Sequence, residues 1–160
     1  MKEVLLVINH VYFLFGATVY VGTMWALRFF FFPSWQSMTI HNVQEHFIVP
    51  TRAATRFFTI VVPLMFVSGL IMLITEWGND EIWPAAVAYL GIIASTFVGY
   101  RQIIPINKKI RAGVDSQEEL IPLLKRWMYL NTLRFYTTTV MWAATVWYLV
   151  AKGNLLDALD

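Results

Sequence analysis

Long stretches without Asp, Glu, Lys or Arg alternate with short polar segments along this chain. Four of these stretches are strongly hydrophobic, and they cover residues 4–27, 57–75, 82–100 and 135–151. A helix of roughly 20 apolar residues crosses the hydrocarbon core of a bilayer, because each residue adds about 1.5 Å along the axis. The last stretch is shorter, but residues 131–134 extend it by one turn. The pattern therefore predicts four transmembrane helices.

The composition leaves too much apolar surface for a soluble domain of this size. Of the 160 residues, 58% are hydrophobic and 14% are charged, so we expect a lipid bilayer to cover what one core cannot. In hydrocarbon, an uninterrupted run of this length is stable as a helix. The expected fold is all-α, a single domain over residues 1–160 that forms an integral membrane four-helix bundle. Its two antiparallel hairpins contain helices at about 4–32, 56–75, 82–104 and 120–151.

The positive charges are unevenly distributed between the connecting segments. Residues 28–56 and 101–134 hold ten of the twelve Lys and Arg residues, whereas the turn at 76–81 carries three acids and no base. Because cytoplasmic loops are enriched in Lys and Arg, we expect both termini on the non-cytoplasmic side of the plasma (inner) membrane. The net charge of +2 gives no indication of a nucleic-acid partner. The chain has no cysteine, which excludes disulfides, thiolate metal sites and cysteine nucleophiles.

The second basic segment has features of a helix start. Gly113 interrupts the chain, and Ser116 with Glu119 three residues later has the spacing of a capping box. Pro122 leaves two alternatives, a helix that begins at Ser116 and bends, or one that begins at Pro122 itself. In both cases the segment continues into the last hydrophobic stretch. We expect an amphipathic arm on the inner surface before helix four.

His10 is the one ionisable residue well inside a predicted span, and such residues are functional candidates because they are costly to bury in hydrocarbon. Arg28 follows eighteen residues later, five helical turns, so both should point into the bundle from one face. A neutral imidazole there can ligate haem iron or another metal, or can act as a catalytic proton acceptor. The alternative is a histidine that only hydrogen-bonds to a neighbouring helix.

Four arginines, one per helix, occur at about the same inner depth, and Asn107, Trp127 and Asn131 accompany them. We consider them as a binding vestibule for a carboxylate, phosphate or enolate. The alternative is that each arginine extends to lipid phosphates separately. The four are Arg28, Arg56, Arg101 and Arg134.

Two further patterns concern metal binding and packing. On a helix His41 and Glu45 share a face, with His46 adjacent, so these three residues are a candidate metal site. A solvated polar cluster is the alternative. Gly91, Ser95 and Gly99 recur every four residues, which predicts close packing against another helix.

Residues 104–109 (Ile-Pro-Ile-Asn-Lys-Lys), followed by Arg126, Trp127, Asn131 and Arg134, resemble the anthrone-oxygenase-like family of small four-helix membrane proteins. The resemblance covers most of the chain, and its motifs are moderately specific. It implies cofactor-free oxygenation of a polycyclic phenolic substrate, with Asn107, Trp127, Asn131 and Arg134 as the residues that match. His41 and His46 have no counterpart in that pattern.

A more distant similarity is to the haem-binding bacterial membrane protoporphyrinogen oxidase. His10 is placed as the early histidine of its first helix, and Arg56 followed by Pro63 fits the start of its second. Tyr100 and Arg101 depart from the pattern at the end of its third helix. This similarity implies haem b, bound by His10.

The expected function is that of an oxygenase-like membrane enzyme acting on a hydrophobic phenolic or anionic small molecule. Arg134 and Asn131 would hold the phenolate or enolate, and His10 or His46 would accept a proton. We expect no cofactor in that case. The alternatives are a haem-binding redox protein that uses His10, and a non-catalytic accessory subunit of a larger membrane complex or homo-oligomer.

Overall fold

A computed structural model of the chain describes residues 1–153, which contain helices and turns but no strand. The first helical unit consists of α1 (Lys2–Ala26), the π-helix η1 (Leu27–Phe31) and the short α2 (Phe32–Trp35). A turn then leads to η2 (Gln44–Ile48), which continues into α3 (Val49–Thr75). The expected all-α fold class is confirmed.

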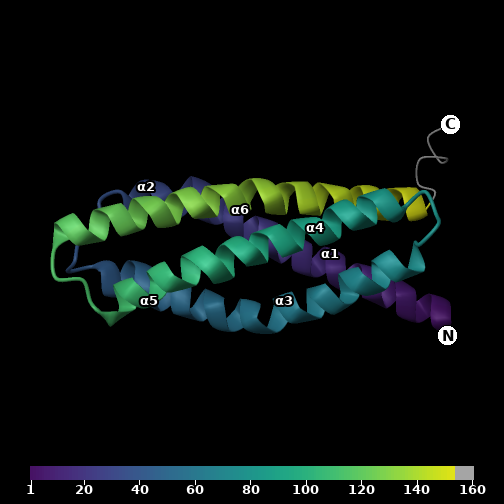
Figure 1. Cartoon of the computed structure of the whole chain (residues 1–160), viewed down its shortest axis with the longest axis horizontal. Coiled ribbons are helices and arrows are strands. Elements are labelled where there is room, and N and C mark those ends of the chain that lie inside the picture. The colour runs from purple at the N-terminus through teal and green to yellow at the C-terminus, as the bar shows by residue number, and fades with distance from the viewer. Residues whose placement is uncertain (154–160) are drawn as a thin grey trace.

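The second half of the chain repeats this plan. After a turn, α4 (Ile82–Val98) continues through η3 (Gly99–Ile103) into α5 (Ile104–Ala112). The longest helix, α6 (Gln117–Lys152), follows. Consecutive long helices run in opposite directions (Figure 1).

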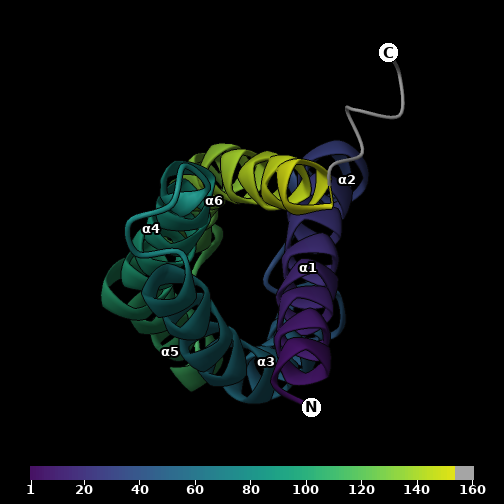
Figure 2. The same ribbon diagram turned by 90° about the vertical axis from the view of Figure 1, so that its right-hand side faces the viewer.

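The four long helices surround a common axis, with α1 opposite α4 and α3 opposite α6 (Figure 2). Each contacts its two neighbours, so the order around the bundle is α1, α3, α4, α6. The start of α1, the α3–α4 turn and the end of α6 lie at one end, here called the acidic end (Figure 1). The opposite end, with α2, α5 and the start of α6, is called the basic end.

Two hydrophobic cores stabilise the bundle. One lies between the four long helices and includes Phe13, Met65, Ile92 and Met141. The other lies at the basic end, where the start of α6 packs on η2, η3, α5 and α2. Its buried residues include Trp35, Phe47, Ile106, Leu124 and Trp127. The predicted amphipathic arm is therefore the first part of α6, and its apolar face is covered by protein.

Each π-helix ends just before an X-Pro pair, at Phe32-Pro33, Val49-Pro50 and Ile104-Pro105. Proline has no N–H and its ring clashes with the carbonyl four residues earlier. A π-type turn adds one residue and moves that carbonyl away. The N–H before each proline accordingly bonds the carbonyl five residues back, as from Phe32 to Leu27. The prolines thus widen these helices and do not end them.

This explains why the predicted helix bounds were too short. The first unit continues past Pro33 to Trp35, and the third continues through Pro105 to Ala112. Helical structure before α3 already begins at Gln44, whereas the second helix was predicted to start at about residue 56. The last helix starts at Gln117, where the Ser116 hydroxyl accepts the Glu119 N–H at 3.3 Å. Of the two alternatives at Pro122, the helix that begins at Ser116 is therefore the one observed.

Within residues 1–153, three helical stretches are long and apolar enough to cross a membrane: Lys2–Trp35, Gln44–Thr75 and Ile82–Ala112. The fourth predicted span, in α6, is not among them. It is interrupted by polar residues, including Asn131, Arg134 and three consecutive threonines. A crossing by α6 therefore stays a prediction.

Candidate functional site

A cavity of about 530 Å³ lies between the helices towards the basic end. Its wall combines residues of all six α-helices and of the widened segments η1 and η3. Most of that wall is apolar, and no Asp, Glu or His lines it. The polar side chains on the wall include Tyr20, Thr51, Thr55, Thr59, Thr96, Tyr100, Asn107, Trp127, Asn131 and Arg134.

Arg134 is the charged residue of this wall, and its partners are neutral. Its Nη1 donates to Asn131 Oδ1 at 2.8 Å, and its Nη2 donates to the Tyr20 hydroxyl. The guanidinium carbon also lies 5.2 Å from the centre of the Tyr20 ring, within range of a cation–π interaction. Arg134 forms no ion pair with any acid in residues 1–153. Its positive charge is therefore left uncompensated at the cavity.

Asn131, Trp127 and Asn107 hold this wall in place. Residues 127, 131 and 134 share one face of α6, because they are separated by four and three positions. Asn131 Nδ2 donates to the Trp127 carbonyl at 3.0 Å, and Trp127 Nε1 donates to Asn107 Oδ1 of α5 at 2.7 Å. All three side chains are buried. The structure thus brings Asn107, Trp127, Asn131 and Arg134 to one cavity; their catalytic and substrate-binding roles stay predictions.

The other predicted arginines do not join them. Arg28, Arg56 and Arg101 are exposed and none lines the cavity. The inward orientation predicted for Arg28 is wrong, because η1 begins at Leu27 and breaks the 3.6-residue count from His10. An exposed arginine at a helix end extends its charged group into water or among lipid headgroups. These three arginines are therefore not part of the cavity wall.

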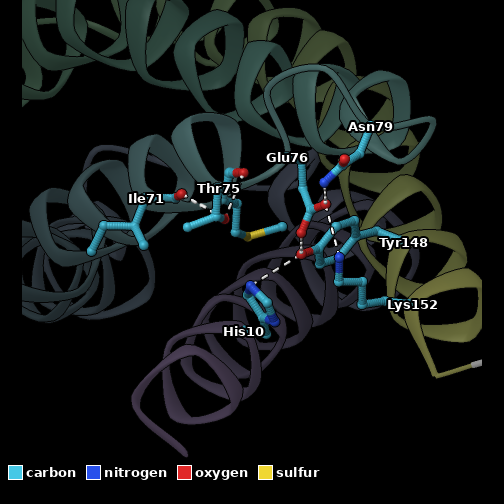
Figure 3. A network of polar contacts seen from close by, with 8 residues as sticks. His10, Ile71, Thr75, Glu76, Asn79, Tyr148 and Lys152 are labelled. Atoms are coloured by element: carbon cyan, nitrogen blue, oxygen red, sulfur yellow. Dashed lines mark hydrogen bonds and ion pairs between the residues drawn. The ribbon is translucent and has the colours of Figure 1, made fainter. Parts of the chain in front are cut away.

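A second polar network lies at the acidic end (Figure 3). The Tyr148 hydroxyl donates to Glu76 Oε1 at 2.8 Å and lies 3.0 Å from His10 Nε2. Glu76 Oε2 accepts from Lys152 at 2.9 Å and from Asn79 at 3.1 Å. The Tyr148 hydroxyl has one proton, which it donates to Glu76. In the contact between Tyr148 and His10, the hydrogen is therefore carried by His10 Nε2, which donates to the hydroxyl oxygen. The network connects α1, the α3–α4 turn and α6.

Glu76 is the anionic centre of this network and is only 2% exposed. Burial raises the pKa of its carboxyl, but the hydrogen bonds from Lys152, Asn79 and Tyr148 and the charge of Lys152 outweigh burial. The pKa of Glu76 therefore lies below its ordinary value of 4.5. The carboxylate is ionised at neutral pH and acts as a fixed acceptor.

His10 is thus placed in a network of its own and does not line the cavity of Asn131 and Arg134. Its ring also packs edge-on against Tyr148, with 5.1 Å between ring centres. A haem iron would need Nε2 without its hydrogen, and ligation would break the contact with Tyr148. This arrangement does not fit haem as it stands, and it matches the structural alternative for His10.

The candidate metal residues are separated too. His41 lies in a turn, so the helical spacing assumed between His41 and Glu45 is wrong. Glu45 and His46 line a surface pocket of about 400 Å³ with Ser34, Ser37 and Asn42, but His41 does not line it. No group of three or more His, Asp or Glu side chains in residues 1–153 is arranged to hold a metal ion.

Sequence reasoning missed Tyr20, Thr96 and the pair Glu76–Tyr148. A signal for Tyr20 existed, because Phe13, Ala17, Tyr20 and Met24 recur every three or four residues and are all buried. Thr96 looks like any threonine of an apolar helix, and the Glu76–Tyr148 contact spans 72 residues of sequence.

No protein-family model matches the chain, and no solved structure matches it.

Proposed function

We propose that the protein is integral to the membrane and crosses it with four helices. Large apolar side chains are exposed along α1 and α3, including Val11, Phe15, Ile60 and Leu64. In α6 the arrangement is inverted relative to a soluble helix, because Thr138 and Thr145 are buried while Val140 and Trp147 are exposed. Lipid is the surrounding that favours such a surface. The uneven distribution of Lys and Arg supports the basic end as cytoplasmic.

The cavity is proposed to bind a hydrophobic small molecule that carries an anionic, phenolic or enolic oxygen. One observation carries this proposal. Within residues 1–153, two buried side-chain polar atoms have no hydrogen-bond partner, Arg134 Nε and Thr96 Oγ1. Both residues line the cavity, on the adjacent helices α6 and α4. A buried donor without a partner is costly. The oxygen of a ligand in the cavity would offset that cost once a small side-chain shift brings it to these atoms.

The apolar remainder of the wall suits a largely hydrocarbon or aromatic body. A volume of about 530 Å³ is in the range of pockets that enclose ligands of drug size. Phe58, Trp35 and Trp127 supply aromatic contact area. A polycyclic phenol would place its oxygen at Arg134 and its rings among these side chains.

Oxygenase-like chemistry is proposed on the family resemblance, and the cavity supports one part of it. In such a reaction an anthrone-type methylene and O₂ give a carbonyl and water, through an enolate formed by loss of a proton. Arg134, Asn131 and Thr96 are donors that stabilise an enolate. No His, Asp or Glu lines the cavity, so water or the ionised form of the substrate has to replace a protein base. Binding is accordingly better supported than catalysis.

The test is binding of 1-hydroxypyrene to the detergent-purified protein, with pyrene as the matched compound without an oxygen. Fluorescence anisotropy is measured for the wild type, Arg134→Lys and, as a control, Arg101→Lys. A lysine keeps the charge but not the planar fork of donors. We expect Arg134→Lys to weaken 1-hydroxypyrene about 10-fold or more, since a hydrogen bond to a charged group contributes about 1.5–3 kcal/mol.

Pyrene should bind the wild type more weakly than 1-hydroxypyrene and should not respond to Arg134→Lys. Arg101→Lys should behave as the wild type. Equal affinity of the two probes for the wild type would contradict the proposed recognition of an oxygen. A Soret band in the purified sample would instead favour the haem alternative.

A further inference from the structure

Exposed residues of α3 and η3 form part of the rim of the cavity, and exposed Phe31 and Pro50 line it towards the basic end. Thr55, Thr59 and Pro63 line the cavity and are also exposed. They recur every four residues, so they form one stripe on α3. Opposite them, Tyr100 of η3 lines the cavity and is 69% exposed. Here the stripe and Tyr100 are called the two lips of a slot.

The deeper wall of the cavity contrasts with these lips. Tyr20, Met24, Trp127 and Asn131 line it and are buried. The polar group of Arg134 thus lies on the inner side, and the exposed residues lie on the outer side. The contrast gives the cavity a lateral opening along α3, with the polar group of Arg134 on its inner side.

The surface beside the slot is apolar. Ile60 is 68% exposed next to the α3 lip, and Phe97 is 60% exposed just before η3. Both belong to helical stretches that are long and apolar enough to cross a membrane. On a membrane protein, an apolar surface of this kind faces lipid tails. Towards the basic end, exposed Arg56 and Arg101 flank the slot, so that part lies at headgroup depth. The part of the slot beside Ile60 and Phe97 therefore opens towards hydrocarbon.

Two backbone features keep the lips apart. Pro63 lies inside α3, where a proline removes a hydrogen bond and bends a helix, and α3 is a bowed helix (Figure 1). On the other side η3 is a π-turn, which is wider than an α-turn. The opening is thus a property of the backbone in both helices.

We propose that the ligand is a membrane-dissolved amphiphile that enters the cavity from the bilayer through this slot. Its apolar body partitions into the inner half of the bilayer, and its oxygen passes between Thr59 and Tyr100 to reach Arg134. This proposal rests on the proposed function and narrows it. It selects compounds that dissolve in lipid over water-soluble anions of the same size.

The absence of native cysteine in the sequence makes the slot testable by a single introduced thiol. Thr59→Cys places it on the lip, and Ile60→Cys places it on the neighbouring lipid-facing position as a matched control. Each variant is reconstituted in phosphatidylcholine vesicles and treated with N-cyclohexylmaleimide, which is bulky and soluble in lipid. The rate of 1-hydroxypyrene binding is then measured by energy transfer from the tryptophans, with the probe delivered in the vesicle membrane.

Labelled Thr59→Cys should bind the probe at least 10-fold more slowly than the unlabelled variant, and bound probe should slow the labelling. Ile60→Cys should show neither effect. A contrary result is one in which wild type and both unlabelled variants bind 1-hydroxypyrene normally, and labelled Thr59→Cys binds it as fast as labelled Ile60→Cys. The slot proposal is then wrong, while the cavity proposal stands. If the wild type binds no 1-hydroxypyrene, the proposed function itself fails. Labelling of Thr59→Cys by a membrane-impermeant maleimide alone would also overturn the slot, because its lip would then face water.

Discussion

In the proposed function Arg134 determines what the cavity prefers, because it is a charged group held by neutral partners. A guanidinium inside a span is costly, by about 2.5–3.5 kcal/mol at the bilayer centre on insertion scales and less near the interface. The side-chain oxygen of Asn131 and the Tyr20 hydroxyl each accept one hydrogen bond from its terminal nitrogens, while Nε has no partner. Such a group repels cations and favours anions or phenols. The same residue thus accounts for both the cost and the specificity of the site.

Tyr20→Phe is predicted to lower stability without closing the cavity. The change removes the acceptor of Arg134 Nη2 and leaves the ring in its place. An unpaired donor costs about 1–3 kcal/mol, so the melting temperature in detergent should fall by several degrees. The control is Tyr12→Phe, which also removes only a hydroxyl, whereas Phe13→Leu would change the packing. The Tyr12 hydroxyl makes a weaker 3.3 Å contact with the Val61 carbonyl, so Tyr12→Phe should lower the melting temperature less than Tyr20→Phe. Equal melting temperatures of Tyr20→Phe and wild type would contradict the role of this hydroxyl.

The lowered pKa of Glu76 predicts how stability depends on pH. In the folded state this pKa lies below the ordinary value of 4.5, so as the pH falls the unfolded state takes up the proton at a higher pH than the folded state does. The stabilisation is complete above about pH 4.5 and is lost as the pH falls through the lowered folded pKa. Wild type should therefore lose thermal stability below pH 4.5.

The variant Glu76→Gln should be less stable than wild type at pH 7, by about 1–3 kcal/mol, and should show less further loss in acid. Glu118→Gln, at an exposed position of α6, serves as the control and should follow the wild type. Parallel melting curves of Glu76→Gln and wild type from pH 7 to pH 3.5 would show that the network does not depend on this charge.

At the level of helices, the hydrophobic pattern predicted the elements and missed the effect of proline. The four apolar stretches predicted four long helices and an all-α fold, because helical periodicity and length are local properties. The predicted bounds of the first and third helices stop before Pro33 and Pro105. A proline either ends a helix or widens it, and the neighbouring contacts decide between the two. The error mattered at Arg28, whose orientation depends on the π-turn. It did not affect residues 127–134, which lie in the uninterrupted helix α6.

The small-residue stripe of α4 also divides into two parts. A methyl group on Gly91 would lie 2.6 Å from Met141 Cβ, while one on Gly99 would lie 3.7 Å from Arg134. Ser95 lies between them and contacts Thr137 through hydroxyls 2.6 Å apart. The stripe does pack against α6, but the helices separate towards Gly99, where the cavity begins.

Gly91→Ala is therefore predicted to be destabilising and Gly99→Ala to be tolerated. The Gly91 substitution forces α4 and α6 apart at a buried contact, which costs about 1–3 kcal/mol. Gly99→Ala adds only an ordinary van der Waals contact with Arg134. Melting temperatures in detergent compare the two variants directly. A larger loss for Gly99→Ala than for Gly91→Ala would contradict the observed packing.

For the whole molecule, the division into an acidic and a basic end organises the candidate chemistry. The network of His10, Tyr148 and Glu76 closes the bundle at one end, and the cavity opens near the other. Between them lies the apolar core that contains Phe13, Met65 and Met141, and His10 does not line the cavity. The sequence predicted Asn107, Trp127, Asn131 and Arg134 of the cavity and His10 of the network, because polar groups are conspicuous in or beside apolar runs. It missed Tyr20, Thr96, Glu76 and Tyr148. It also did not predict that the cavity and the network form separate sites, since that depends on contacts between distant helices.

The orientation of α6 is the decisive property of the whole molecule, because α6 carries Arg134 and is the one long helix outside the apolar set. If it crosses the membrane, its two ends lie on opposite sides, and the positive-inside rule places the start in the cytoplasm.

Green fluorescent protein fused after Gly113 should fluoresce, whereas alkaline phosphatase fused after Gly153 should be active outside. A fusion after Met38 reports the other basic connection and should match the one after Gly113. Packing of α6 against α1 and α4 compensates for its polar residues, since their partners are inside the bundle. Reporters after Gly113 and Gly153 on the same side would show that α6 does not cross, and the cavity would then border water and not lipid.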